Sequence, residues 1–307
     1  MTNEELKELQ ALPLPFKIEV TMQRIRDFYE RLNGKVYVAF SGGKDSTVLL
    51  HLVRSIYTDV LAVYGNTGID IPSVRKFALA HENVKIVYPK KTFGRILKED
   101  GIVYPSKIVA QLVKDARNGA NYALHYLKGE NKDGSISEYK KSNYAKWYSL
   151  LEKNVKISDK CCDYLKEEPM IDFERKSGLR PIIGIMATES TRRRDAWLKT
   201  GCNSFKSGKE KSKPLSFWND QDVLEYIVQN RLEIAEAYGE IKRNSKGKLY
   251  TTKEQRTGCM FCAIPLAHKR NRLPQVKKEA PKIYDTFINK HGLGKMLEEL
   301  GLEYETA

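Results

Sequence analysis

Hydrophobic residues recur with two different periods along this chain. Ile18, Met22, Ile25, Phe28 and Leu32 fall on one stripe of a helix predicted over residues 17–32. Residues 2–10 have a similar helical pattern. The short β-branched run KVYVAF predicts a buried strand, and the apolar stretch STVLLHLVRSIY predicts the helix that follows it.

The same alternation continues downstream. Strands are expected at 59–68, 83–89 and 179–187, and helices at 73–82 and 219–231, the last capped by Asn219 or Asp220. Strands that alternate with helices indicate a mostly parallel sheet with right-handed crossovers. The predicted fold is therefore a Rossmann-like α/β domain, which binds its ligand at the carboxyl ends of the strands.

Three segments are expected from these patterns. Residues 1–32 form an N-terminal helical segment, and residues 33–230 form the α/β domain. A Lys- and Tyr-rich, largely helical insertion at 105–160 interrupts that domain. Residues 231–307 are irregular and basic before closing with helices near 277–290 and 294–300.

Charge and composition narrow the class of protein. Lys and Arg outnumber Asp and Glu by 53 to 39, for a net charge of +14, which favours a polyanionic partner or a solvated Lys-rich surface. No apolar run approaches the roughly 18 residues of a membrane span, and the first ten residues are too acidic for a signal peptide. We expect a cytoplasmic protein without a membrane partner, whose five cysteines are reduced.

The loop Ser-Gly-Gly-Lys-Asp-Ser-Thr lies between the first buried strand and its helix. Glycines let the backbone approach an anion, and a helix N-terminus adds N–H donors. The hydroxyls of Ser41, Ser46 and Thr47 and the charge of Lys44 also favour a phosphate group. The spacing differs from a Walker A motif, which has four residues between its first Gly and Gly-Lys.

This loop resembles the PP-loop of the ATP pyrophosphatases, which wraps the terminal phosphates of ATP. The match falls on Ser41, Gly42, Gly43, Asp45 and Ser46. The resemblance implies that Ser41 and Ser46 bind phosphate oxygens. It also implies that Lys44 and Asp45 neutralise charge or help to hold Mg²⁺.

Four of the cysteines occur in pairs. Cys161 and Cys162 are adjacent, and Cys259 and Cys262 form Cys-X-X-Cys. Two pairs of thiolates can bind a zinc ion or an iron–sulfur cluster, and the remaining alternative is four unligated thiols. Adjacent cysteines favour the cluster over zinc, because neighbouring side chains diverge and a cubane offers separate irons.

Cys-Cys followed by a distant Cys-X-X-Cys resembles the [4Fe-4S] signature of the APS/PAPS reductase family, and the likeness runs from about residue 33 to 265. The family has an adenine nucleotide alpha hydrolase-like fold. The segment YGNTGIDIPSVRKF resembles its turn after the second strand, where the likeness implies a nucleotide contact for Asn66, Thr67 and Gly68. The segment GIMATESTRR matches its substrate loop at Gly184, Ile185, Glu189, Ser190 and Arg193.

Three departures separate the chain from sulfonucleotide reduction. No cysteine follows Cys262, although these reductases attack with a cysteine near the C-terminus. Met186 replaces an arginine of the substrate loop, and Ser41–Ser46 keeps the full ATP-cleaving form. The fifth thiol, Cys202, is a candidate nucleophile or persulfide carrier, with a small buried residue as the alternative.

Two basic regions add candidate contacts. Arg192, Arg193 and Arg194 are expected to clamp phosphate oxygens, or else form a solvated face. The insertion carries tyrosines and Trp147 among its lysines, a combination that can stack bases and follow a phosphate backbone. Aromatic residues on an amphipathic helix can equally belong to a core.

The leading hypothesis is an enzyme of sulfur metabolism that cleaves ATP to AMP and pyrophosphate, activating an acceptor for sulfur transfer. It requires a [4Fe-4S] cluster, Mg²⁺ and a sulfur donor. Lys44, Asp45, Arg193 and Cys202 are its expected catalytic residues. The second hypothesis is a PAPS or APS reductase that makes sulfite with Cys202 or an external thiol reductant. The third is a nucleotide or redox sensor that binds nucleic acid, and a nucleic acid is also a candidate acceptor for the first.

Overall fold

A computed structural model describes residues 1–305, and these divide into two compact units that are each built from separate stretches of chain. Unit 1 comprises residues 1–66, 71–88 and 169–257. Unit 2 comprises residues 67–70, 89–168 and 258–305 of the described chain. Thr306 and Ala307, the last two residues of the segment expected at 231–307, lie outside the described residues.

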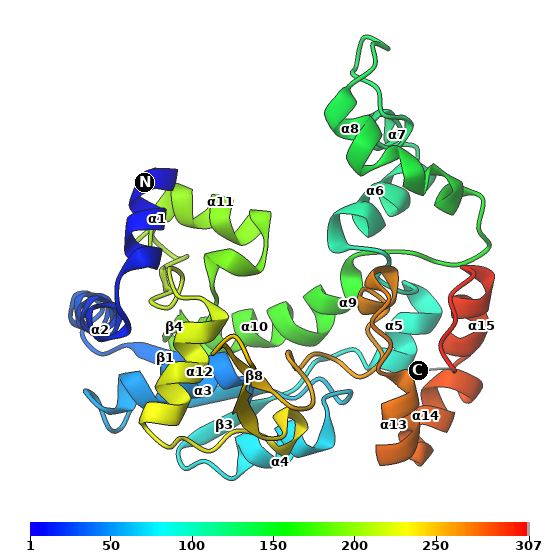
Figure 1. The fold of residues 1–307 in the computed structure, drawn as a ribbon. Helices are drawn as coiled ribbons and strands as arrows, with labels where there is room; N and C mark the ends of the chain where they lie inside the picture. Colours follow the sequence, from blue (N-terminus) through cyan, green and yellow to red (C-terminus); the bar gives the residue numbers. More distant parts are fainter. Residues whose placement is uncertain (306–307) are drawn as a thin grey trace. The chain divides into compact units, whose positions relative to one another are not determined.

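Unit 1 contains a six-stranded sheet in the order β3-β2-β1-β4-β6-β5 (Figure 1). All neighbouring strands are parallel except β5 and β6, which are antiparallel. The strands are β1 (Val36–Ala39), β2 (Ala62–Gly65), β3 (Val84–Val87), β4 (Arg180–Ile183), β5 (Asn203–Ser204) and β6 (Lys211–Ser212). The expected mostly parallel α/β fold is confirmed.

Helices flank this sheet, and a small hairpin follows the last of them. The helices are α1 (Asn3–Ala11), α2 (Leu14–Arg31), α3 (Lys44–Arg54), α4 (Pro72–Leu79), α10 (Glu168–Ser177), α11 (Thr191–Thr200) and α12 (Asp220–Gln229). Of the two expected caps, Asn219 or Asp220, it is Asn219 that caps α12, since its side chain accepts from the N–H groups of Gln221 and Asp222. The hairpin pairs β7 (Ile241–Arg243) with β8 (Leu249–Thr251).

The sheet buries a core on each face. Val36 and Val38 of β1 belong to the larger core, whereas Tyr37 between them packs with Val63 and Phe173 on the opposite face. This is the two-residue alternation of a strand buried on both sides. The larger core includes Leu6, Ile25 and Phe28 of the N-terminal helices, together with residues of α3 and α12.

The N-terminal helices are therefore part of unit 1. Lys17 of α2, almost fully buried, forms an ion pair with Asp222 of α12 at 2.7 Å. Thr21 accepts a hydrogen bond from the indole of Trp218 at 2.8 Å. The division of the chain accordingly differs from the boundaries expected at residues 32 and 230, because residues on both sides of each boundary share one core.

Unit 2 is almost entirely helical. Its helices are α5 (Phe93–Glu99), α6 (Lys107–Arg117), α7 (Asn121–Lys128), α8 (Glu138–Asn143), α9 (Lys160–Cys162), α13 (Leu273–Glu279), α14 (Pro281–Asp285) and α15 (Leu293–Glu299). Short 3-10 or π turns cover Ala145–Leu151, Asp163–Glu167, Pro265–His268 and Thr286–Lys290, and others at Ala187–Glu189 and Glu236–Tyr238 belong to unit 1.

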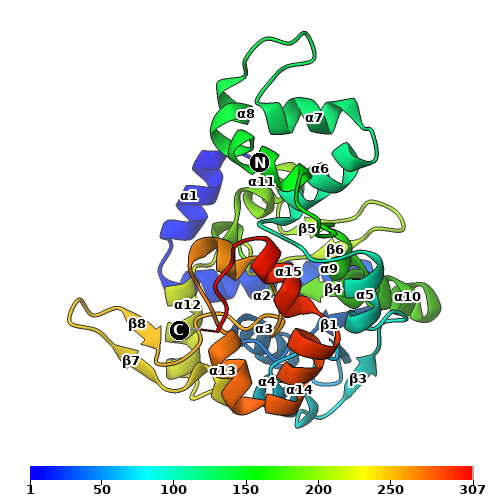
Figure 2. The ribbon, with the colours of Figure 1, turned by 90° about the vertical axis from the view of Figure 1, so that its right-hand side faces the viewer.

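Aromatic rings join the separate stretches of unit 2. Phe93 of α5 contacts Phe261 and Phe287 with ring centroids 6.1 and 5.1 Å apart. Gly94 lies against the ring of His291, where any side chain would collide. Figure 2 shows α13, α14 and α15 grouped in orange and red. Throughout residues 1–305, no helix is long and apolar enough to cross a membrane.

Candidate functional site

The loop Ser41–Thr47 connects β1 to α3, and close backbone packing fixes its glycines. Gly42 has a positive φ of 69°, and a side chain there would lie 2.8 Å from the carbonyl oxygen of Val74. Only glycine fits such a position without a shift of the backbone. The loop is thus held against the first turns of α4, with Gly43 as the N-cap of α3.

Hydroxyl groups hold the loop in a closed turn. The hydroxyls of Ser41 and Ser46 lie 3.1 Å apart, and the amide of Gly43 donates to Ser41 Oγ at 3.3 Å. Ser46 and Thr47 both donate to the carbonyl oxygen of Gly43, at 2.9 and 3.1 Å. The structure therefore gathers all three hydroxyl residues of the predicted phosphate site around one backbone turn.

Lys44 has carboxylate partners within the protein. Its ammonium lies 2.9 Å from Asp45 Oδ1 and 2.9 Å from Asp220 Oδ1, and its side chain is 3% exposed. Burial acts to lower the pKa of Lys44, but the two carboxylates outweigh it and the pKa is raised. The ammonium is charged at neutral pH and directed at the first turn of α12.

The segment after β4 packs directly on this loop. A side chain at Gly184 would lie 3.1 Å from the carbonyl oxygen of Asp45 and 3.3 Å from Ser46 Cα. A residue larger than glycine would have to displace the loop. This contact brings the two segments singled out in the sequence, at 41–47 and 184–193, to one place in unit 1.

Glu189 connects two arginines in this region. Its carboxylate pairs with Arg193 and lies 3.4 Å from Arg256, and it accepts the amide of Met186 at 2.9 Å. Burial and the charge of Arg256 lower the pKa of Arg193, and the charge of Asp45 opposes them. Arg193 is therefore within electrostatic reach of the loop carboxylate.

The other members of the predicted arginine clamp face elsewhere. Arg192 is exposed, and Arg194 is 3.7 Å from the carboxylate of Asp195. Ser190 acts as the N-cap of α11 by accepting from the amide of Arg193 at 3.3 Å. Of the three consecutive arginines, Arg193 is the one directed toward the loop residues.

Sequence reasoning missed four residues that complete this region. Lys44 N donates to Tyr238 Oη at 3.0 Å, and that hydroxyl lies 2.9 Å from Thr257 Oγ1. Arg256 and Asp220 contribute the contacts given above. Asp220 was recognised only as a candidate helix cap. The other three come from a stretch with no periodic pattern, so nothing in the sequence alone marked them.

The predicted contacts after β2 form a tight turn. The amide of Asn66 donates to the carbonyl of Val87 at 2.9 Å and so extends the pairing of β2 with β3. The amide of Thr67 donates to Asp70 at 2.9 Å, and its hydroxyl accepts from Ile69 at 3.2 Å. Gly68 has a positive φ of 77° with open space around it.

The four paired cysteines all lie in unit 2. Cys161 and Cys162 are on α9, and Cys259 and Cys262 flank a turn closed by the hydrogen bond from Cys262 N to Cys259 O at 3.3 Å. All four are half-buried free thiols. Met260, between the second pair, donates its amide to the carbonyl of Ile69 at 2.9 Å.

These thiols act on one another electrostatically. Burial raises the pKa of Cys161, and the charges of Cys259, Cys162 and Cys262 raise it further. Burial also raises the pKa of Cys262 to about 11. The charge of Cys259 is the largest cause of the raised pKa of Lys166, so a cation belongs to the same group. Within residues 1–305, no three His, Cys, Asp or Glu side chains converge closely enough to hold a single metal ion.

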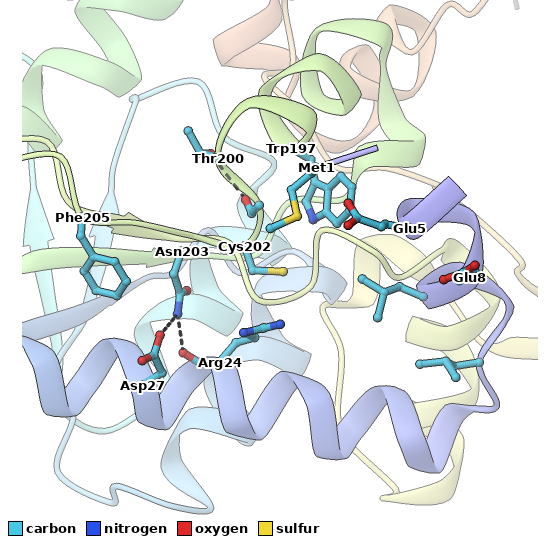
Figure 3. A pocket seen from close by; sticks show the side chains of 13 residues that line it. Met1, Glu5, Glu8, Arg24, Asp27, Trp197, Thr200, Cys202, Asn203 and Phe205 are labelled. Atoms are coloured by element: carbon cyan, nitrogen blue, oxygen red, sulfur yellow. Dashed lines mark hydrogen bonds between the residues drawn. The ribbon is translucent and has the colours of Figure 1, made fainter. Parts of the chain in front are cut away.

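Cys202, the fifth thiol, belongs to unit 1. It is 7% exposed beside β5, and its sulfur accepts a hydrogen bond from Ser216 Oγ at 3.5 Å. Its neighbouring cation is Lys213. Burial and the charge of Lys211 lower the pKa of Lys213, and the opposing effect of Cys202 is smaller. The thiol lines a cavity formed by residues 1–27 and 197–205 (Figure 3).

Comparison with known proteins identifies the family. The model of the phosphoadenosine phosphosulfate reductase domain matches residues 35–98 and 106–265. The chain belongs to this family. Two uncharacterized proteins of Methanocaldococcus jannaschii are similar: MJ0973 is 33% identical over 272 residues, and MJ0066 is 23% identical over 293 residues. The alignments cover 86% and 91% of this chain but 50% and 47% of those proteins, so the chain spans about half their length.

Solved structures with related backbones include a phosphoadenylyl-sulfate reductase from Candida auris in complex with phosphate. Its TM-score is 0.40 and its sequence identity is 17%, and the match covers 77% of this chain and 90% of the reductase chain. The U34-tRNA thiolase NcsA from Methanococcus maripaludis, solved with its [4Fe-4S] cluster, has a TM-score of 0.35 and a sequence identity of 14%. That match covers 92% of this chain and 79% of the thiolase chain. An FMN adenylyltransferase from Candida glabrata has a TM-score of 0.41 and a sequence identity of 12%, and the match covers 76% of this chain and 65% of that chain.

Proposed function

We propose that this chain is an enzyme that cleaves ATP to AMP and pyrophosphate and thereby activates an acceptor for sulfur transfer. The observation that supports it best is the assembly of an intact Ser41–Ser46 turn with Arg193 near Asp45. A hydroxyl-rich turn at a helix N-terminus binds phosphate oxygens. Guanidinium groups stabilise the charge that moves onto a leaving phosphate.

Each residue of the site has a chemical part in this scheme. Ser41, Ser46 and Thr47 hold the β- and γ-phosphates on the turn, and Gly42 and Gly43 allow their close approach. Arg193 and Arg256, oriented by Glu189, neutralise the pyrophosphate as the α–β bond breaks. Asp45 holds the Mg²⁺ that accompanies ATP, and Lys44 fixes that carboxylate. Asn66, Thr67 and Gly68 bind the ribose or adenine.

The paired thiols have the chemistry that a [4Fe-4S] cluster needs. Four half-buried cysteines from two stretches of unit 2 are mutually coupled, and Lys166 offsets their negative charge. Cys161, Cys162, Cys259 and Cys262 would hold the cluster. With all four irons ligated by thiolates, the bound cluster would supply fixed charge as an electrostatic anchor, and the activated acceptor would receive its sulfur from an external donor such as sulfide. Free thiols throughout are compatible with a cytoplasmic location.

The second candidate is reduction of PAPS or APS to sulfite. The family match supports it, because that family is defined by this reductase domain. The attacking thiol would be Cys202 or an external reductant. Cys202 lines its own cavity with residues 1–27 and 197–205, so an external thiol fits this alternative better.

The exposed side chains of the insertion at 105–160 favour a nucleic acid as the acceptor. Tyr139, Tyr122 and Tyr148 are exposed large hydrophobic side chains. Three lysines of the same segment are also exposed: Lys128 is on α7 with Tyr122, Lys141 is on α8 with Tyr139, and Lys132 lies between these two helices. Aromatic faces among unburied lysines bind bases and phosphates together.

The direct test uses anaerobically purified protein with ATP, sulfide as the sulfur donor, and mixed tRNA, rRNA and DNA as acceptors. The acceptor displaces pyrophosphate from ATP and sulfide then displaces AMP, so we expect acceptor-dependent release of both, lost in Ser46→Ala and Arg193→Ala. Sulfite formation from PAPS or APS with a thiol reductant, without pyrophosphate from ATP, would replace this proposal with the second candidate.

A further inference from the structure

The amide of Lys44 is held by a hydroxyl from far along the chain. Lys44 is the first residue of α3, and its N–H donates to Tyr238 Oη at 3.0 Å across 194 residues of sequence. That hydroxyl lies 2.9 Å from Thr257 Oγ1, and Tyr238 is 2% exposed. Burial raises the pKa of Tyr238, so its hydroxyl stays protonated and can pair with Thr257 while a lone pair accepts from Lys44. Neither hydroxyl belongs to the phosphate contacts proposed above.

The peptide group between Gly43 and Lys44 is held from both sides. Its carbonyl oxygen accepts from the hydroxyls of Ser46 and Thr47 at 2.9 and 3.1 Å, which are contacts within the loop. Its N–H is held from outside the loop, by Tyr238. Because a peptide group is planar, fixing its C=O and its N–H together fixes its orientation.

The orientation of this peptide sets the direction of the next two amides. The first N–H groups of a helix have no partner within the helix. Among residues 1–305, the amides of Asp45 and Ser46 have no hydrogen-bond partner, whereas the amide of Lys44 has Tyr238. Asp45 and Ser46 therefore supply the two backbone donors at the start of α3 that remain for a phosphate.

The backbone of the tyrosine is itself fixed. Tyr238 closes the short turn Glu236–Tyr238, and its carbonyl oxygen accepts from the amide of Lys253 at 3.1 Å. The carbonyl oxygen of Ala237 accepts from the amide of Glu254, also at 3.1 Å. The stretch after β8 thus supports the turn, and a supported side chain can place its hydroxyl precisely enough to orient the loop.

We propose that Tyr238 is a positioning residue of the loop Ser41–Thr47, because its hydroxyl directs the amides of Asp45 and Ser46 at a phosphate before the nucleotide binds. The role rests on the proposed function, which assigns the phosphates of ATP to this loop. Donors that are already oriented bind without an ordering cost. Loss of the hydroxyl should therefore weaken nucleotide binding and raise KM, with kcat nearly unchanged, since the bound loop is ordered equally in the ground and transition states.

Three single variants of the full chain test this role. Tyr238→Phe removes the hydroxyl, and Thr257→Val removes its partner but leaves the bond to Lys44. The control is Tyr37→Phe, which also removes the hydroxyl of a buried tyrosine in unit 1. That hydroxyl donates to Glu174 at 2.8 Å and has no contact with the loop. Chemical unfolding measures the stability of each variant.

The amide of Lys44 can be observed directly by nuclear magnetic resonance. Labelling with ¹³C-carbonyl glycine and ¹⁵N-lysine selects the five Gly-Lys pairs of the sequence, and the Lys44 signal is the one that disappears in Lys44→Arg. In Tyr238→Phe we expect this signal to move upfield and its hydrogen exchange to become about tenfold faster. In Tyr37→Phe both should match wild type.

Isothermal titration with a non-hydrolysable ATP analogue measures the consequence for binding. We expect affinity to fall about tenfold in Tyr238→Phe and about threefold in Thr257→Val, as for the loss of one and part of one hydrogen bond. Tyr37→Phe should stay within about twofold of wild type. KM for ATP should follow the same order, while kcat changes by less than about twofold.

Two results would overturn the positioning role. Wild-type affinity in Tyr238→Phe, despite a shifted Lys44 signal, means that the contact serves folding alone. An equal loss of affinity in Tyr37→Phe means that lower stability explains both. If Tyr238→Phe does not fold, Thr257→Val decides, and unchanged affinity there also overturns the role.

Failure of the proposed function gives a different result. Wild type would then bind the analogue but release no pyrophosphate with any acceptor. A tenfold weaker affinity of Tyr238→Phe for the analogue would still support the positioning role in that case, because binding is measured without cleavage.

Discussion

Glu189 forms ion pairs with two arginines, Arg193 and Arg256, and its charge can be removed with little change of shape. In Glu189→Gln the amide oxygen can still accept from the amide of Met186. The ion pairs with Arg193 and Arg256 are lost. We expect KM for ATP to rise about tenfold, equivalent to ~1.4 kcal/mol, with a melting temperature within a few degrees of wild type.

The matched control is Glu19→Gln, which removes an exposed carboxylate on α2 of the same unit. It should leave KM and kcat unchanged. If Glu189→Gln binds ATP as tightly as wild type, the arginines do not contact the nucleotide. That outcome would also remove Arg193 from the proposed mechanism.

Gly184 tests whether the loop and the segment after β4 must touch. In Gly184→Ala the new methyl group would lie 3.1 Å from the carbonyl oxygen of Asp45, so the loop must shift by a few tenths of an ångström. We expect a stability loss of about 1–3 kcal/mol, typical of overpacking, and a larger proportional loss of nucleotide binding. Isothermal titration with a non-hydrolysable ATP analogue and chemical unfolding measure the two effects.

Gly65→Ala is the corresponding control on β2. Its methyl group would lie at an ordinary distance of 3.8 Å from the sulfur of Met170, and its φ requires no glycine. Nucleotide binding should be retained there. Equal losses in the two variants would mean that Gly184 matters only for folding.

At the scale of elements, periodic patterns predicted the sheet well and its edge poorly. Strands β1 to β4 and helices α2, α3 and α12 have enough apolar residues for a period to be visible. The strands β5 and β6 have two residues each and lie in a polar, Lys-rich stretch, so no alternation marks them. The antiparallel edge of the sheet therefore could not be predicted from the sequence.

The candidate site was predicted only in part for a related reason. The loop and the residues Gly184, Glu189 and Arg193 follow recognisable strand ends. Tyr238 and Thr257 reach the loop from a stretch without periodicity, through single hydroxyl contacts. The direction of the Lys44 ammonium depends on Asp220, 176 residues away in the chain, and a pairing at that range leaves no local pattern.

The insertion can be tested as a nucleic-acid surface by changing only exposed lysines. Lys107 and Lys114 are paired with acidic residues, and Arg117 donates to three backbone carbonyls, so these cations have structural roles. The triple substitution of Lys128, Lys132 and Lys141 to alanine should weaken RNA binding uniformly across sequences. The slope of log K against log salt should fall by about 0.7 to 0.9 for each phosphate that a lysine no longer neutralises.

The control for that experiment removes the same charge elsewhere. Lys76, Lys246 and Lys248 are exposed in unit 1, on α4 and at the β7–β8 hairpin. Their triple alanine variant should leave the salt slope unchanged. If both variants weaken binding equally, attraction is due to the net charge of +14 and not to the insertion.

At the scale of the whole molecule, the cysteine pairs connect two stretches of chain that are far apart in sequence. Cys161 and Cys162 belong to the 89–168 stretch, and Cys259 and Cys262 to residues 258–305. A cluster bound by all four would tie these stretches together, so its binding free energy would add to the stability of unit 2. Unit 1 contains none of the four thiols.

This gives a prediction that distinguishes the two units by cluster content and by hydrogen exchange. Anaerobically purified wild type should contain about four iron and four sulfide per chain, as should Cys202→Ser, whose thiol lies in unit 1. Cys259→Ser should lose most of both. Hydrogen exchange should then become faster across 89–168 and 258–305 while residues of the β1–β4 sheet keep their protection. Zinc at one equivalent in place of iron, or equal deprotection of both units, would contradict the assignment of a [4Fe-4S] cluster that joins the two stretches of unit 2.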